Sequence, residues 1–312
     1  MSDNNFWQKI NKPILALAPL AGFTDSAFRQ IATEYGADIV YSEMASATAL
    51  FYDQAATLNL LKFDKQKEKN YVVQLFGSDP DHFAAATKIV TQKIKPQGID
   101  INLGCPVGKV IKQGAGAALM ADLVKAHAVI KAVCDNTDLP VSIKIRTKSG
   151  AIGALDFLDS IADLPVAAVM IHGRSLRQGF VGEIDYDLIK EARHHFPGII
   201  IANGGINNLV QAKKTLALTG ADGLGLARGV LGRPWLFKEI KNNQEINLDI
   251  KEIAAVVLHQ AEIFQKLKGE AAFVDLRKHL CWYVQGIPGA ANYRSQLVKI
   301  ENYQDIKNIF KF

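Results

Sequence analysis

Short apolar runs alternate with longer amphipathic stretches along most of the chain, and the alternation repeats eight times. Each run is about five residues long and almost continuously apolar, which is typical of parallel strands that are buried on both faces. The stretches between the runs have helical spacing, as at Phe83, Ala86, Val90 and Ile94. The runs are Ile14–Ala18, Asp38–Tyr41, Tyr71–Leu75, Gly98–Asn102, Val141–Ile145, Ala167–Ile171, Ile199–Ala202 and Asp222–Leu226.

Eight strand–helix units within roughly 230 residues predict a (β/α)8 TIM barrel. A doubly wound parallel sheet is the alternative arrangement of the same units. That fold would need a Gly-x-Gly-x-x-Gly sequence near the first strand, and none occurs there. We therefore expect an α/β protein in which the barrel domain occupies residues 1–243.

The remaining segment, 244–312, has no strand pattern and is predicted to form a small all-helical C-terminal domain. Its first helix is expected over Lys251–Lys268, which has an apolar stripe at helical spacing. Further helices are expected over Ala271–Gln285, Ala290–Val298 and Tyr303–Phe310. The stripe consists of Ile253, Val257, Ala261, Phe264 and Leu267.

The charge and the cysteine content narrow the class of protein. The 36 basic and 31 acidic residues give a net charge of +5, which weakly favours an anionic partner without establishing one. Cys105, Cys134 and Cys281 are widely spaced, so neither a disulfide framework nor a metal site is expected. Met1–Lys12 lacks a signal-peptide pattern, and the apolar runs are too short to span a bilayer. We therefore expect a cytoplasmic protein that does not enter membranes.

In a TIM barrel the chemistry lies at the carboxyl ends of the strands, where side chains from different strands converge. Each predicted strand ends in a polar or conformationally permissive group, so all of these groups should meet at one mouth of the barrel. In strand order they are Pro19, Glu43, Gln74, Asn102 with Cys105, Lys144 with Arg146, His172, Asn203 and Arg228.

The loops after the seventh and eighth strands have the composition of a phosphate site. Asn203-Gly204-Gly205 and Ala227-Arg228-Gly229 expose backbone N–H groups without obstructing side chains, and they add one guanidinium. These loops are the usual phosphate-binding position of TIM barrels. The alternative is that the glycines only permit tight turns. We favour a phosphorylated cofactor, because both loops and the arginine fall on the expected strands.

Lys144 and Arg146 are predicted to point into the barrel, because Ile143 and Ile145 alternate with them and should pack outward. A buried ammonium group is costly without an anionic partner, and a reduced flavin, which carries negative charge on its ring, would be such a partner. The alternatives are the Schiff-base lysine of an aldolase and a solvated pair at the strand end.

Three other residues suggest how a planar substrate or cofactor would be handled. The side-chain amide of Gln74 can both donate a hydrogen bond to the edge of a planar ring and accept one from it. His172 can contact a phosphate, a ring or only core carbonyls. Cys105 lies between Gly104 and Pro106 in a loop rather than inside an apolar run. Because a cysteine thiol is mostly protonated at neutral pH, Cys105 can donate a proton without an activating base; the alternative is that it only packs.

The order and spacing of these motifs resemble the tRNA-dihydrouridine synthase family over nearly the whole chain. The tail motifs Arg277-Lys278-His279, Trp282-Tyr283 and Gly286–Ala290 are similar to those of its bacterial B-type branch. The barrel motifs that carry the resemblance are Ala18–Asp25, Gln74–Gly77, Asn102–Pro106, Lys144–Arg146, Ile171–Arg174, Asn203–Ile206 and Ala227–Gly229.

The resemblance implies reduction of specific uridines in tRNA to 5,6-dihydrouridine, with bound FMN as cofactor and NADPH as reductant. Hydride would pass from the flavin to C6 of the uracil, and Cys105 would protonate C5. Asn102 would orient the uracil, and Arg146 would lie close to it. The residues expected to hold FMN are Ala18, Pro19, Gln74, Lys144, His172, Asn203, Gly204, Gly205, Ala227, Arg228 and Gly229.

The resemblance also implies that the helical tail helps to hold tRNA, but its composition supports this only weakly. Residues 244–312 contain nine basic and eight acidic residues, so 9 − 8 = +1. A phosphate-binding surface must therefore come from local clusters, and a solvated helix face is the alternative for each charge. No protein partner is expected. The candidate cluster consists of Arg277, Lys278 and Arg294, together with Lys109 and Lys112 of the barrel.

Other classes of function also remain compatible with parts of this pattern. A flavin barrel acting on a small enoate or a dihydroorotate-like substrate explains the barrel but leaves the helical tail without a purpose. An aldolase explains Lys144 but not the positions of Gln74 and Cys105. A non-catalytic tRNA-binding protein is the third alternative, and the intact set of strand-end groups argues against it.

Overall fold

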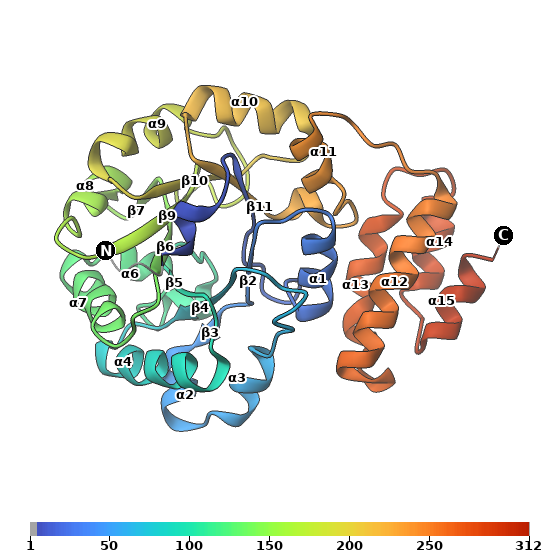
Figure 1. Ribbon diagram of the computed structural model, residues 1–312, viewed down its shortest axis with the longest axis horizontal. Helices are drawn as coiled ribbons and strands as arrows, with labels where there is room; N and C mark the ends of the chain where they lie inside the picture. The colour runs from blue at the N-terminus through green and yellow to red at the C-terminus, as the bar shows by residue number, and fades with distance from the viewer. Residues whose placement is uncertain (1–4, 312) are drawn as a thin grey trace.

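The computed structural model describes residues 5–311. Its larger part is a domain built around a closed ring of parallel strands (Figure 1). The eight ring strands are hydrogen-bonded in parallel, and the pairing of β2 with β4 closes the ring. The predicted TIM barrel is therefore confirmed. The strands are β1 (Ile14–Leu17), β2 (Ile39–Tyr41), β4 (Tyr71–Phe76), β5 (Gly98–Asn102), β6 (Val141–Arg146), β9 (Val166–His172), β10 (Ile199–Asn203) and β11 (Gly223–Leu226).

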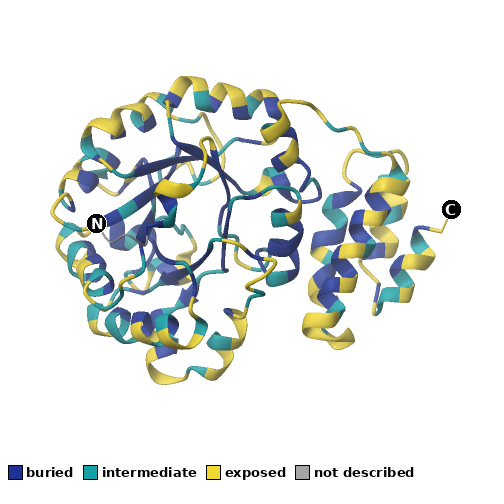
Figure 2. Cartoon of the chain, in the orientation of Figure 1, coloured by how far each residue is buried: buried dark blue, intermediate teal, exposed yellow. Residues whose placement is uncertain are grey.

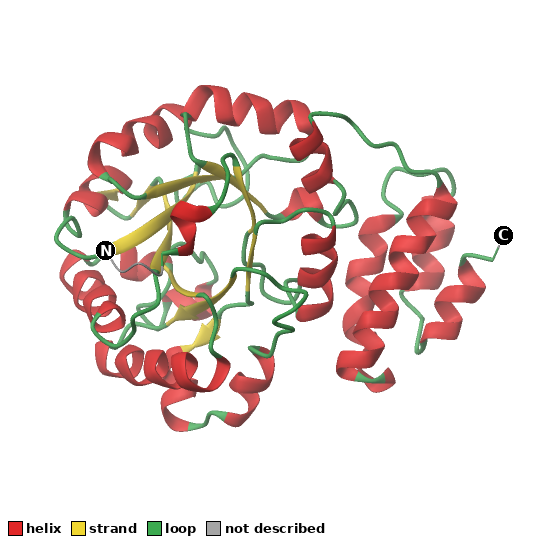
Figure 3. Ribbon diagram, viewed as in Figure 1, coloured by secondary structure: helices red, strands yellow, loops and turns green. Residues whose placement is uncertain are grey.

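The connections between the strands are mainly helical and surround the ring (Figure 3). Several helices start where an aspartate side chain accepts a hydrogen bond from a free backbone N–H, as at Asp25, Asp79 and Asp122. They are α1 (Ser26–Glu34), α2 (Ala47–Tyr52), α3 (Ala55–Leu60), α4 (Pro80–Ile89), the π-helical η2 (Val90–Ile94), α5 (Gly108–Ile111), α6 (Ala117–Met120), α7 (Leu123–Cys134), α8 (Ala154–Asp159), α9 (Tyr186–His195), α10 (Leu209–Thr219), the 3-10 turn η3 (Arg228–Val230) and α11 (Leu236–Asn242).

The tail is helical, as predicted, and its first helix begins at a capping box formed by Asp249 and Glu252. Four residues of the predicted stripe are buried, but the fifth, Leu267 in the last turn, is 48% exposed. No helix within residues 5–311 is both long and apolar enough to cross a bilayer. The tail comprises α12 (Ile250–Lys268), η4 (Glu270–Ala272), α13 (Phe273–Tyr283), α14 (Ala290–Leu297) and α15 (Tyr303–Ile309).

Three short strands were not predicted from the sequence. β3 (Ala45–Ser46) pairs with the end of β4, and β7 (Lys148–Ser149) forms a small hairpin with β8 (Ile152–Gly153). Each has two residues, which is too short to produce a periodic pattern. Residues 1–4 and 312, the outer ends of the two predicted domains, lie outside the described residues.

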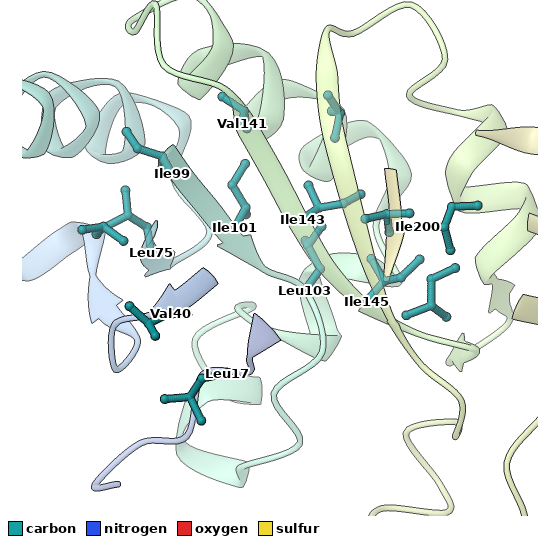
Figure 4. Packing of buried hydrophobic residues seen from close by; sticks show 14 of the residues in the cluster. Leu17, Val40, Leu75, Ile99, Ile101, Leu103, Val141, Ile143, Ile145 and Ile200 are labelled. Atoms are coloured by element: carbon teal, nitrogen blue, oxygen red, sulfur yellow. The ribbon is translucent and has the colours of Figure 1, made fainter. Parts of the chain in front are cut away.

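Alternate residues of each ring strand face opposite sides of the barrel wall. The outward set, which includes Ile99, Ile101, Ile143 and Ile145, packs against the surrounding helices (Figure 4). The ring is dark with buried residues, whereas the outer helix faces are exposed (Figure 2). The inward set is smaller and includes Ala16, Met170 and Ile201, which pack with Trp7 of the turn η1 (Phe6–Lys9).

The tail packs on the barrel through α1. Ala27 and Ile31 of α1 share a buried apolar cluster with Val257, Phe264 and Leu280 of the tail. An ion pair of 2.9 Å between Lys268 Nζ and Asp25 Oδ2 adds a polar contact at the same interface. The position of α1 therefore decides where the tail sits relative to the barrel mouth.

A fully buried ion pair fixes α1 to the barrel. The Arg29 guanidinium donates to Glu68, which also accepts the amide of Asp64 at 2.9 Å. Arg29 donates further to the backbone carbonyls of Thr24 at 2.7 Å and Lys62 at 2.9 Å. Because both charged side chains are completely shielded from solvent, each depends on the other for its charge to be tolerated.

Replacement of Glu68 by alanine should lower the free energy of unfolding by about 3–5 kcal/mol, because it leaves the Arg29 charge buried without its carboxylate. Urea unfolding followed by circular dichroism measures this change. Glu262→Ala is the matched control, since it breaks an exposed pair with Lys266 and should hardly change the midpoint. Equal midpoints for the two variants would contradict the anchoring role of the buried pair.

Candidate functional site

The carboxyl ends of the ring strands surround one cavity of about 550 Å³. Every residue that the sequence analysis named as a catalytic, substrate or cofactor residue lines it, so the structure brings all of them together. They are Ala18, Pro19, Gln74, Asn102, Cys105, Lys144, Arg146, His172, Asn203, Gly204, Gly205, Ala227, Arg228 and Gly229.

The two glycine loops present bare backbone to the cavity. At Gly204, which has φ of +109°, an added Cβ would lie 2.7 Å from the His172 ring. At Gly229 an added Cβ would lie only 2.0 Å from the carbonyl oxygen of Ile206. Asn203, where the first of these loops begins, is held against β11, because its Nδ2 donates to the carbonyl of Gly225 at 2.6 Å. Only glycine therefore fits at these two positions, as an anion cradle of backbone N–H groups requires.

Four cationic side chains line the cavity, namely Lys144, Arg146, Arg174 and Arg228, and within residues 5–311 no carboxylate lines it. Burial and the neighbouring Arg146 lower the pKa of Lys144 to about 8. Burial and the same cations lower the pKa of His172 to about 2, so its imidazole is neutral at physiological pH. A site with this charge and donor set is suited to an anionic ligand.

Arg146 links two loops of the cavity wall. Its Nε donates to the carbonyl of Gly104 at 2.7 Å, and its Nη1 donates to the carbonyls of Ser175 at 3.0 Å and Gly179 at 2.9 Å. The cysteine loop after β5 is thereby attached to the loop after β9. Inward projection of Lys144 and Arg146 was predicted correctly, but this bridging function has no sequence signal.

Asn102 organises the start of the cysteine loop. Its Oδ1 accepts the backbone amides of Gly104 at 3.2 Å and Cys105 at 2.9 Å, while its Nδ2 donates to Gln74 Oε1 at 2.9 Å. Gln74 Nε2 donates in turn to Asp100 at 2.7 Å. The side chain of Gln74 therefore keeps one N–H and one oxygen lone pair for a ligand, rather than its whole amide as the sequence suggested.

The sequence analysis missed two aromatic side chains of the cavity, Phe180 and Trp282. Phe180 lies in the loop after β9, with the guanidinium carbons of Arg228 and Arg146 at 4.9 Å and 5.7 Å from its ring centre. Phe180 was not predicted because it lies well beyond the end of β9, and only the residues directly after each strand were considered. Trp282 comes from α13 of the tail, and no periodicity could place a tail residue at the barrel mouth.

The remaining candidates divide between the cavity and other sites. Lys278 lies near the first loop, with its Nζ 5.6 Å from the Phe23 ring centre, whereas Arg277 is turned inward and donates to the carbonyl of Ile300 at 2.9 Å. All three cysteines are free thiols, and Cys134 and Cys281 are absent from the cavity lining. No cluster of metal-binding side chains occurs in the part of the chain that the structure describes.

Comparison with known proteins agrees with this geometry. Residues 16–311 match the family model for dihydrouridine synthase (Dus). The chain is 33% identical over 301 residues to the probable tRNA-dihydrouridine synthase 1 of Synechocystis sp., covering 94% of this chain and 84% of that protein. It is also 33% identical over 309 residues to tRNA-dihydrouridine synthase B of Vibrio cholerae, covering 96% and 94%.

Solved structures show the same fold at much lower identity. The old yellow enzyme homologue from Zymomonas mobilis superposes with a TM-score of 0.54 at 12% identity, covering 77% of this chain and 91% of that chain. This likeness shows the fold alone, whereas the family match and both relatives extend over nearly the whole sequence. The chain therefore belongs to the dihydrouridine synthase family.

Proposed function

We propose that this tRNA-dihydrouridine synthase holds FMN at the barrel mouth and uses NADPH as its reductant. The observation that carries the proposal is the cavity itself, in which a bare-backbone cradle and four cations lie beside Cys105 without any lining carboxylate within residues 5–311. When bound, the flavin would supply the hydride that reduces the uracil ring. The proposed FMN contacts are Ala18, Pro19, Gln74, Lys144, His172, Asn203, Gly204, Gly205, Ala227, Arg228 and Gly229.

Residues of this chain supply the charge, the substrate contacts and the proton that the reaction also needs. Lys144 supplies positive charge beside the flavin ring, and the neutral His172 can donate or accept a single hydrogen bond without adding charge. The target uridine must leave the tRNA stack, because its ring has to enter the cavity. Asn102 and Arg146 flank the uracil, and the Cys105 thiol gives a proton to its C5 atom.

We also propose that residues 1–243 form the catalytic domain and residues 244–312 a tRNA-binding helical domain. The tail reaches the mouth through Trp282, and Arg294 on α14 is exposed. Lys278 of α13 packs over Phe23 of the first barrel loop, which also lines the cavity. The position of Lys278 supports the proposal that tail cations lie near the opening through which a flipped nucleotide would pass.

The FMN assignment predicts that Arg228→Ala weakens retention of FMN by about 10–100-fold, because it removes one charge-assisted phosphate contact. Flavin fluorescence during equilibrium dialysis measures the dissociation constant. Lys213→Ala, which removes an exposed charge on α10, should leave binding unchanged. An Arg228→Ala protein that keeps flavin as tightly as the unaltered protein would show that the phosphate lies elsewhere.

The role of Cys105 predicts that the two half-reactions separate on mutation. Cys105→Ala should bind FMN and accept electrons from NADPH normally, while reoxidation of the flavin by unmodified tRNA slows by about 10²–10⁴-fold. Cys105→Ser should be intermediate at best, since a hydroxyl is a weaker acid. Rapid mixing of reduced enzyme with tRNA gives the rate, with Cys134→Ala as control. An unchanged rate in Cys105→Ala would remove the proton-donor assignment.

The tail assignment predicts that Arg294→Ala binds tRNA several-fold more weakly and reduces the slope of log affinity against log salt by about 1, because one phosphate contact is lost. Filter binding over a range of salt concentrations measures both quantities. Lys213→Ala again serves as the control for a loss of one positive charge. If the two variants have the same slope, Arg294 does not contact the RNA backbone.

A further inference from the structure

A carboxylate lies inside the barrel directly beneath the candidate site. Asp100 of β5 is laterally paired with Gln74 on β4 and with Ser142 on β6, and all three are buried side chains on the inner face of the wall. Gln74 Nε2 donates to Asp100 Oδ2 at 2.7 Å, and Ser142 Oγ donates to Asp100 Oδ1 at 2.7 Å. Asp100 itself does not line the cavity, so any effect on the chemistry must pass through its neighbours.

The ionised carboxylate determines the orientation of two amide groups in turn. It can only accept hydrogen bonds, so the NH₂ group of Gln74 must face it. The Gln74 oxygen must then face Asn102 and accept from its NH₂ group, at 2.9 Å. This orientation leaves the Asn102 oxygen directed at the amides of Gly104 and Cys105. Reversal of either amide would set two N–H donors against each other.

We propose that Asp100 is a positioning residue for Cys105, which acts by fixing the orientation of Gln74 and, through Gln74 and Asn102, the backbone of the cysteine loop. The inference rests on the proposed role of Cys105 as proton donor. It assigns a purpose to a buried carboxylate that contributes no ion pair to the fold and that contacts neither cavity nor solvent.

The charge state of Asp100 fits this role at neutral pH. Burial raises the pKa of the Asp100 carboxyl to about 6, and its hydrogen bonds with Gln74 and Ser142 and the nearby Lys144 limit the rise. The titratable groups that face it are Lys144 from β6 and Tyr41 from β2, whose pKa burial and Asp100 raise. The acceptor-only form therefore predominates above pH 7, whereas below about pH 6 the protonated form can donate and no longer fixes the Gln74 orientation.

The first experiment measures access to the Cys105 thiol in a background with Cys134→Ala and Cys281→Ala. The readout is the limiting rate of alkylation by iodoacetamide at high pH, which reports exposure of the thiol rather than its ionisation. Asp100→Asn, nearly isosteric, should raise this rate about tenfold, because an amide can present its NH₂ group as well as its oxygen to Gln74. The orientation that directs the Asn102 oxygen at the loop is then no longer enforced. Ser142→Ala removes the other bond to Asp100 but keeps the acceptor, so it should alkylate at the unaltered rate.

A second variant tests orientation directly. In Gln74→Glu combined with Asp100→Asn, the new asparagine donates to the new carboxylate, whose other oxygen again accepts from Asn102. The total charge of the site is unchanged, and the alkylation rate should return to within about twofold of the starting value. Failure of this rescue, or an equal acceleration by Ser142→Ala, would overturn the proposal, because general loosening of the barrel interior would then explain the effect.

The unaltered protein provides a measurement that requires no variant to fold. Amide hydrogen exchange at Cys105, corrected for the intrinsic pH dependence of exchange, should lose protection as the pH falls through about 6. The amide of Leu103, which donates to the backbone carbonyl of Lys144 at 2.9 Å, should keep its protection. Parallel behaviour of the two amides would contradict the proposal.

Activity separates this proposal from the proposed function. In the flavin-loaded enzyme, Asp100→Asn should lower kcat with tRNA about tenfold and leave KM for tRNA unchanged. If Asp100→Asn raises the alkylation rate of Cys105 but Cys105→Ala is fully active, the positioning role of Asp100 is supported and the proton-donor role of Cys105 is wrong. If Asp100→Asn leaves the alkylation rate unchanged, the positioning role falls whatever Cys105 does.

Discussion

The alternation of side chains across the barrel wall is the constraint on which the rest of this structure depends. On β5, Ile99 and Ile101 point outward into the helix layer, so Asp100 and Asn102 must point inward. The same alternation on β6 directs Ile143 and Ile145 outward and Lys144 inward. The same alternation therefore accounts both for the apolar core between strands and helices and for the polar side chains inside the barrel. A shift of one residue in either strand would bury the charges among the helices and leave the core without its isoleucines.

The closed ring also explains how so much positive charge is held at one opening. Lys144, Arg146, Arg174 and Arg228 converge because the strands that carry or precede them converge. Burial, together with the positive charge of these four side chains, lowers the pKa of His172. Without a lining carboxylate within residues 5–311 to neutralise them, this arrangement costs stability, which a bound anion would restore. The fold can sustain that cost because the outward-facing apolar layer supplies most of the stability.

The sequence predicted the strands and most of their terminal groups, because both follow from local periodicity and from the rule that barrel chemistry lies at strand ends. Glu43 is an exception: it does not line the cavity, and its carboxylate accepts the backbone N–H of Gly22 instead. Lys144, His172 and Arg228 could be placed by this rule. Trp282 could not, because its position depends on how the tail packs on α1, which is a long-range contact without a local pattern. Asp100 was overlooked for a different reason: a carboxylate inside a strand has no meaning until its lateral partners Gln74 and Ser142 are known. The bridging bonds of Arg146 likewise require the positions of two loops.

The cysteine loop is held at the mouth of the barrel by side chains of the barrel wall. It is anchored from two adjacent strands, by Asn102 at the amides of Gly104 and Cys105 and by Arg146 at the carbonyl of Gly104. The two anchors meet at the peptide group between Gly104 and Cys105, where Asn102 accepts the N–H and Arg146 donates to the carbonyl, so neither can replace the other. Because both anchors are side chains of barrel strands, the backbone beside the thiol is positioned by the barrel wall. The cavity that this loop lines also receives Trp282 from the tail, so barrel and tail both contribute to the candidate site.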